Sequence, residues 1–153
     1  MPTTRYRDGR TLITLTTEGR HSDVLPPERR LVAFVRGEGE QVLEGATGIA
    51  VPQPRWRDGY HDEQIGVERA WADALGAAAA AGARNLQLEP LDPAAAGFPD
   101  EPLVFILFHT VRRYLREQPA HPFETITIAA PAAATDVYQR VFDEFVRTMV
   151  GTP

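Results

Sequence analysis

The order of apolar and polar residues along the chain predicts strands that alternate with helices. Thr11–Thr16 alternates threonine with aliphatic residues, which is the two-residue period of a strand with one buried face. Leu31–Val35 is apolar throughout, as in a strand buried on both faces, and it runs into a glycine-rich turn. The predicted central strands are Thr11–Thr16, Leu31–Val35, Thr47–Val51, Asn85–Leu88 and Thr125–Ala129.

Three segments instead have the 3.6-residue period of helices. Asp62–Ala81 carries apolar residues on one side, and Gly82 follows where a helix C-terminus is expected. A second helix opens at Asp100 and has apolar residues on more than one face, which predicts deep burial. Thr135 is expected to cap a final helix. This alternation predicts one α/β domain over residues 1–153, with a largely parallel sheet and no linker or repeat.

Missing residue types exclude several kinds of chemistry. The 153 residues include no Cys, no Lys, one Ser (Ser22) and one Asn (Asn85). A thiolate zinc site, a thiol nucleophile, a P-loop and a Schiff base are therefore excluded. Ser22 stands outside any Gly-x-Ser-x-Gly motif. Carboxylates, four histidines, tyrosine, threonine and backbone amides remain for catalysis.

Charge and hydropathy limit the partners and the location. The formal net charge of -5 argues against general nucleic-acid binding, which needs an excess of basic residues. No apolar run approaches 18 residues, and Met1–Arg5 lacks the apolar core of a signal peptide. We therefore expect a cytoplasmic protein that does not bind membranes. Sixteen arginines without a lysine, together with 21 alanines, are typical of a GC-rich bacterial genome.

Three polar groups have a functional and a structural interpretation. His61 lies among carboxylates and could act as a general base, but Asp62 and Glu63 also fit a solvated helix start, which we favour. The four histidines form no i,i+4 pair, so we predict no metal site and no cofactor. Arg112, Arg113 and Arg116 could bind an anion or an acidic partner, or could form the solvated face of a helix.

From Ile49 to Phe145 the chain resembles a macro domain, the α/β/α module that recognises ADP-ribose. Ile49–Gly59 is similar to a family strand that ends in a Gly-Pro-x-Trp stretch, and the elements that follow keep the family order. The sharpest likeness is Asp92–Pro99, where the family has Ser-Thr-Gly-x-x-Gly-Phe/Tyr-Pro. Gly97, Phe98 and Pro99 match that motif. The resemblance implies a three-layer α/β/α sandwich whose mixed, largely parallel sheet carries a ligand at this loop.

Other family features are missing. The family follows its second buried strand with Asn-Ala-Ala-Asn and a glycine loop that hold the distal ribose, whereas Val35 is followed here by a short turn. Asn85 lies at the head of a different strand, so no residue fills the catalytic Asn role. The family's loop amides hold a diphosphate, and Asp92, Pro93 and Ala94 replace the residues that would do so with a charge, a missing N–H and a restricted backbone.

We therefore interpret the chain as a degenerate macro-like domain, without assigned catalytic residues. The candidate binding loop consists of Asp92, Pro93, Ala94, Ala95, Ala96, Gly97 and Phe98, and the secondary candidates are Arg36, Gly37 and Glu38. The first hypothesis is a binding module for a nucleotide-like or other small ligand at a remodelled cleft. The second is a homo-oligomeric assembly protein, at least a dimer, in which a partner copy covers the surface that the missing segment exposes. The third is an ADP-ribose-type hydrolase using Asp92, Glu38 or His61.

Overall fold

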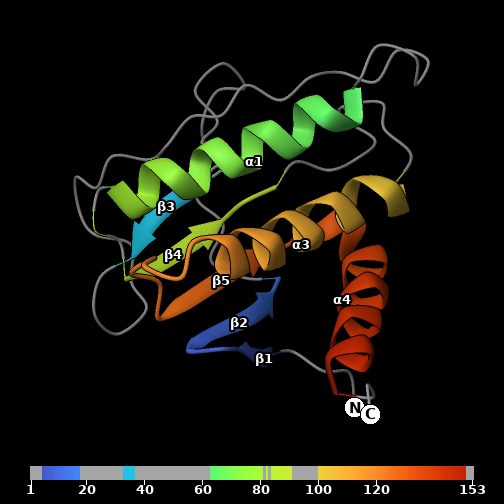
Figure 1. The fold of residues 1–153 in the computed structure, drawn as a ribbon. Coiled ribbons are helices and arrows are strands. Elements are labelled where there is room, and N and C mark those ends of the chain that lie inside the picture. Colours follow the sequence, from blue (N-terminus) through green and yellow to red (C-terminus); the bar gives the residue numbers. More distant parts are fainter. Residues whose placement is uncertain are drawn as a thin grey trace.

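The computed structural model describes residues 5–17, 33–36, 63–80, 82, 84–90 and 100–150, and all structural statements below concern these ranges (Figure 1). The strands are β1 (Arg5–Asp8), β2 (Thr11–Thr16), β3 (Ala33–Arg36), β4 (Asn85–Leu88) and β5 (Thr125–Ala129). The helices are α1 (Glu63–Ala80), α3 (Asp100–Glu117) and α4 (Thr135–Val150), and a short 3-10 helix, η4 (Ala132–Ala134), directly precedes α4.

The strands form one mixed sheet in the order β1-β2-β5-β4-β3. The three central strands are parallel: Ile13 of β2 lies opposite Ile126 of β5, and Ile126 lies opposite Leu86 of β4. Each edge strand is antiparallel to its neighbour, β1 to β2 and β3 to β4. The structure therefore has the predicted α/β fold with a mixed sheet whose centre is parallel, and its antiparallel pairings lie at the edges.

Three of the five predicted strands lie wholly in the described ranges and have the predicted bounds. The predicted strand Leu31–Val35 overlaps β3, and its first two residues lie outside the described residues. The predicted strand Thr47–Val51 lies outside the described residues. Strand β1 was not predicted, because three of its four residues are charged. It pairs with β2 through a turn in which Gly9 has a φ of 60°, a left-handed conformation that glycine adopts without strain.

The helices begin and end close to the predicted positions. The predicted helix Asp62–Ala81 is observed as Glu63–Ala80, and Gly82 follows it with a φ of 77°, as expected for a helix C-terminus. The prediction that Thr135 caps α4 is wrong. Its backbone is already helical, and its hydroxyl donates a hydrogen bond to the carbonyl of Ala132, because η4 leads straight into α4.

The main core lies between the three helices and one face of the sheet. Tyr6, Ile13, Ile126 and Leu86 lie opposite one another across four strands, so their side chains share that face. Helices α1 and α3 pack together over it, and α4 packs on α3 (Figure 1). Figure 1 shows α3 between α1 and α4. Aromatic rings join the layers: Phe142 of α4 lies 5.4 Å from Tyr6 and 5.5 Å from Phe108 of α3, measured between ring centroids.

The second face of the sheet is buried along β4 and β5. Gln87 of β4 and Thr127 of β5 lie opposite each other on that face and are buried, and Ala129 is fully buried. Burial of both faces is what a three-layer sandwich requires. In the described part of the chain, no helix is long and apolar enough to cross a membrane.

Candidate functional site

The carboxyl ends of the parallel strands meet at one edge of the sheet. Thr16 of β2 lies opposite Ala129 of β5, and Leu88 of β4 lies opposite Ile128, so the three strands end within one residue of the same level. The N–H of Ala130 donates to the carbonyl of Thr16 at 2.8 Å and extends this pairing beyond β5. Open α/β sheets bind ligands outside such carboxyl ends. This edge is therefore the candidate site.

The chain leaves β4 at this edge and returns in α3. Leu88 ends β4, Glu89 and Pro90 are buried directly after it, and Asp100 begins α3. The candidate loop Asp92–Phe98 belongs to the connection between these two elements, and it lies outside the described residues. The connection thus leaves a central strand and leads into a long helix.

A buried polar pair, which the sequence analysis missed, lies where β4 ends. The side-chain amide of Gln87 donates a hydrogen bond of 2.9 Å to the Glu89 carboxylate, and both residues are almost completely buried. Buried amides and carboxylates need such partners, because an unsatisfied one costs about 1–3 kcal/mol. The sequence signal was available: Gln87 and Glu89 alternate with Leu86 and Leu88, which places them on one face. The pair brings an acidic group to the candidate edge.

One of the secondary candidates, Arg36, is separated from this edge. Arg36 lies opposite Asn85, at the amino end of β4, while Glu89 follows its carboxyl end. The three residue steps from Asn85 to Leu88 correspond to about 10 Å of strand. Gly37 and Glu38 lie outside the described residues.

Of the polar residues around His61, only Glu63 lies in the described ranges. It begins α1 and is buried. His109 is exposed on α3, and His121 is buried beside Phe123. The described residues contain no group of three or more side chains that could hold a metal ion. The sequence-based expectation of no metal site stays a prediction.

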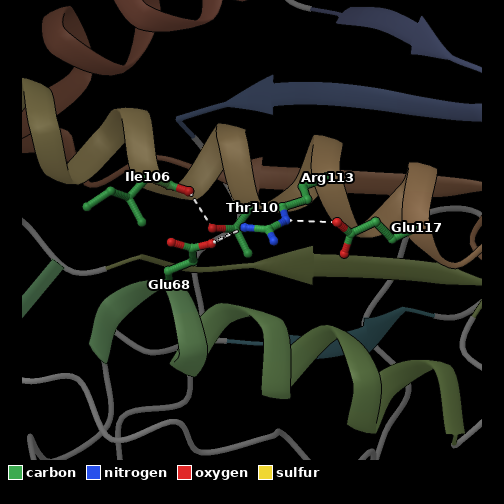
Figure 2. A network of polar contacts seen from close by, with 5 residues as sticks. All are labelled: Glu68, Ile106, Thr110, Arg113 and Glu117. Atoms are coloured by element: carbon green, nitrogen blue, oxygen red, sulfur yellow. Dashed lines mark hydrogen bonds and ion pairs between the residues drawn. The ribbon is translucent and has the colours of Figure 1, made fainter. Parts of the chain in front are cut away.

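Two of the arginines on α3 have different surroundings. Arg113 forms ion pairs of 2.9 Å with Glu68 of α1 and with Glu117, one helical turn further along α3 (Figure 2). Both carboxylates raise the pKa of the Arg113 guanidinium, and the hydrogen bond that Arg113 donates to Glu117 contributes most. Arg112 forms no ion pair with any described residue, and it lines a hollow between α3 and α4. Arg113 is therefore a structural link between α1 and α3, and Arg112 is available for a partner.

Two hollows flank α3 on the helical side of the molecule. The one between α1 and α3 has a volume of about 290 Å³ and is bordered by the Glu68–Arg113–Glu117 network in Figure 2. The one between α3 and α4 has a volume of about 200 Å³, with Phe105, Val141 and Phe145 as its apolar lining. Each hollow is bordered by one half-exposed apolar residue. Ile65, which is 47% exposed, borders the hollow between α1 and α3, and Phe105, which is 50% exposed, borders the hollow between α3 and α4.

Comparison with known proteins relates the fold to one class. The structure is similar to that of a mutant macrodomain from Oceanobacillus iheyensis, with a TM-score of 0.66 over 97% of this chain and 100% of that chain. The two sequences are 10% identical. No protein-family model and no curated protein sequence matches the chain significantly. The fold is thus macrodomain-like, in agreement with the resemblance of the sequence.

Proposed function

We propose that the protein is a non-catalytic binding module that holds a nucleotide-like small molecule at the carboxyl edge of its sheet. The candidate loop Asp92–Phe98 is the proposed binding segment, and Arg36, Gly37 and Glu38 stay secondary candidates. The observation that carries the proposal is the macrodomain-like fold, in which β4 and α3 flank this loop. The resemblance of Gly97, Phe98 and Pro99 to the family's ligand loop supports it.

The acidic groups around this edge favour a ligand without a diphosphate. Glu89 is fully buried after β4, Asp92 follows three residues later, and α3 begins with Asp100. Carboxylates repel phosphate groups and accept hydrogen bonds from amino and hydroxyl groups. A nucleoside, whose base and ribose supply such donors, matches this environment better than ADP-ribose does.

The proposal is tested by NMR titration of the ¹⁵N-labelled protein with adenosine, AMP and ADP-ribose. We expect adenosine to perturb the amides of residues 86–98 and to bind more tightly than ADP-ribose. Phe98→Ala should weaken this binding by removing a ring that can stack on the base. Phe105→Ala, on the outer side of α3, is the matched control and should leave it unchanged. If no compound perturbs these amides, or if the perturbations map elsewhere, the proposal fails.

Assembly without a small-molecule site is the second candidate function. The half-exposed Phe105 beside the hollow between α3 and α4 favours it, because aromatic side chains are enriched at the centres of protein interfaces. The hydrolase hypothesis has less support. Its three candidate groups, Asp92, Glu38 and His61, all lie outside the described residues.

A further inference from the structure

One stripe of α3 faces away from the sheet and combines charge with aromatic surface. Glu101, Phe105, His109 and Arg112 follow one another at intervals of three or four residues, so they share one side of the helix. Glu101, Phe105 and His109 are exposed, and Arg112 is partly exposed. We call these four residues the outer stripe of α3. It borders the hollow between α3 and α4 along its length.

The centre of the outer stripe is aromatic. The rings of Phe105 and His109 are stacked, with centroids 5.8 Å apart and planes inclined by 10°. On its other side Phe105 contacts Phe145 of α4, with centroids 5.3 Å apart. Half of the Phe105 residue surface nevertheless remains exposed. Large aromatic side chains of this kind are typical anchors of protein interfaces.

The ends of the outer stripe carry opposite charges. Glu101 lies in the first turn of α3, and Arg112 lies near its carboxyl end. The helix dipole alone favours acids at the start and bases at the end. It does not account for an exposed phenylalanine midway between them. The charge order together with the aromatic centre makes the stripe complementary to itself in the antiparallel direction.

We propose that a second copy of this chain docks on the outer stripe, with the two α3 helices antiparallel about a two-fold axis. This inference does not depend on the proposed ligand site. In this arrangement Phe105 of one copy faces His109 of the other and enters the hollow between α3 and α4. Glu101 of each copy faces Arg112 of its partner. A two-fold axis requires such self-complementarity, because the same surface serves both copies.

The spacing along α3 fits this pairing. The two-fold axis that places Phe105 of one copy opposite His109 of the other crosses α3 at the level of Leu107, which is midway between them in the sequence. At a rise of about 1.5 Å per residue, Glu101 lies about 9 Å to one side of this point and Arg112 about 7.5 Å to the other. These two distances differ by about 1.5 Å, which the long side chains of Glu101 and Arg112 can span. Glu101 already pairs with Arg140 at 3.4 Å, but both side chains are more than half exposed, and such pairs exchange at little cost.

Sedimentation of the whole chain between about 1 μM and 1 mM tests the surface, because weak association lies in this range. We expect a monomer–dimer equilibrium for the wild type. Phe105→Ala should raise the dimer dissociation constant by about tenfold or more, since it removes the aromatic anchor. Ile65→Ala is the matched control: Ile65 is exposed to nearly the same degree, but it borders the other hollow. It should leave the equilibrium unchanged.

Charge reversal tests the antiparallel pairing itself. Glu101→Arg alone and Arg112→Glu alone should each be monomeric, because each places like charges opposite one another in the dimer. Mixed together they should form a heterodimer, since every facing pair is then of opposite charge. Circular dichroism melting confirms that each variant is folded.

Three results would overturn the proposal. The first is a wild type that is monomeric over the whole concentration range. The second is a dimer that Ile65→Ala disrupts and Phe105→Ala does not. The third is a mixture of the two charge variants that stays monomeric, which would mean that the outer stripe binds another kind of partner or none.

Discussion

The imidazole Nδ1 of His121 accepts a hydrogen bond from the backbone N–H of Phe123, with 3.1 Å between the two nitrogen atoms. An imidazole can accept at Nδ1 only when that nitrogen carries no proton. The His121 ring is also stacked on Phe123, with centroids 5.5 Å apart. Arg10 donates hydrogen bonds to the carbonyls of Pro119 and His121 in the same segment. A neutral His121 is thus part of the connection between α3 and β5.

This arrangement predicts a loss of stability in mild acid. Burial lowers the pKa of His121 below its usual value, and the Arg10 guanidinium lowers it further, while Asp8 partly opposes them. The unfolded chain therefore binds a proton before the folded chain does. The contribution of neutral His121 to the free energy of unfolding is complete above about pH 6.5, the ordinary histidine pKa. It is lost as the pH falls from there through the lowered pKa of His121 in the folded protein. Urea unfolding measured between about pH 7.5 and pH 5 should show this decline.

His121→Asn isolates the effect of this one group. The Asn side-chain oxygen can accept the same N–H bond but does not titrate. The variant should therefore lose less stability than the wild type over the same pH interval. His109→Asn, which removes an exposed imidazole, should behave like the wild type. Equal declines for the wild type and His121→Asn would show that His121 does not govern the acid sensitivity.

Phe108 and Phe105 lie on the same helix and should differ greatly in their contribution to stability. Phe108 is 1% exposed and contacts Tyr138, Phe142 and Phe145 of α4. Phe108→Ala should lower the free energy of unfolding by about 3–5 kcal/mol, because it leaves a cavity between α3 and α4. Phe105→Ala should cost about 1 kcal/mol or less, since half of that residue is already exposed. Urea denaturation at low protein concentration measures both; similar losses would contradict the core described above.

The Gln87–Glu89 bond should stabilise the end of β4. Gln87→Met keeps the length of the side chain but removes the donor to the buried Glu89 carboxylate. We expect a loss of about 1–3 kcal/mol in the free energy of unfolding. Gln118→Met, at an exposed position just after α3, should change it little. If both variants unfold at the same urea concentration as the wild type, the amide of Gln87 is not needed at this position.

Local sequence patterns predicted the elements that have strong local signals. The helix from residue 63 to 80 and the strands at residues 11–16, 85–88 and 125–129 all have a clear apolar period. Strand β1 lacks such a period, because Arg5, Arg7 and Asp8 give it a polar sequence. Tyr6 and the Asp8-Gly9 dipeptide before β2 were its only local signals. What makes this segment a strand is also its pairing with β2, and that pairing is a tertiary contact.

The candidate site was predictable only in part for the same reason. The carboxyl edge follows from the order of strands and helices, so the sequence was sufficient to predict where this edge lies; the ligand loop between Leu88 and Asp100 stays a prediction. Of the outer stripe of α3, the sequence singled out only Arg112, as a member of the group Arg112, Arg113 and Arg116. The hollow beside this stripe depends on where α4 packs, because Phe145 and Val141 of α4 complete its lining next to Phe105. The separation of Arg112 from the paired Arg113 also requires the position of Glu68 on α1.

The last prediction concerns ADP-ribose. The protein should neither hydrolyse ADP-ribose esters nor bind free ADP-ribose with micromolar affinity. The resemblance of the sequence implies that the family's catalytic Asn is missing, and that a diphosphate would meet Asp92 and the missing N–H of Pro93 where the family's loop offers amides. Calorimetric titration is the direct measurement. A dissociation constant near 1 μM, about -8 kcal/mol, would show that the altered loop still holds a diphosphate.

Restoring the family's loop residues provides the complementary experiment. The triple variant Asp92→Ser, Pro93→Thr, Ala94→Gly removes one negative charge, returns one N–H donor and gives the backbone the freedom of glycine. It should bind ADP-ribose more tightly than the wild type does. Asp92→Ser alone should recover only the part of the binding free energy that is lost to charge repulsion. Circular dichroism melting controls for a change in fold. If the triple variant binds no better than the wild type, the loop between β4 and α3 is not an anion site in this protein, and assembly through α3 becomes the better account of its function.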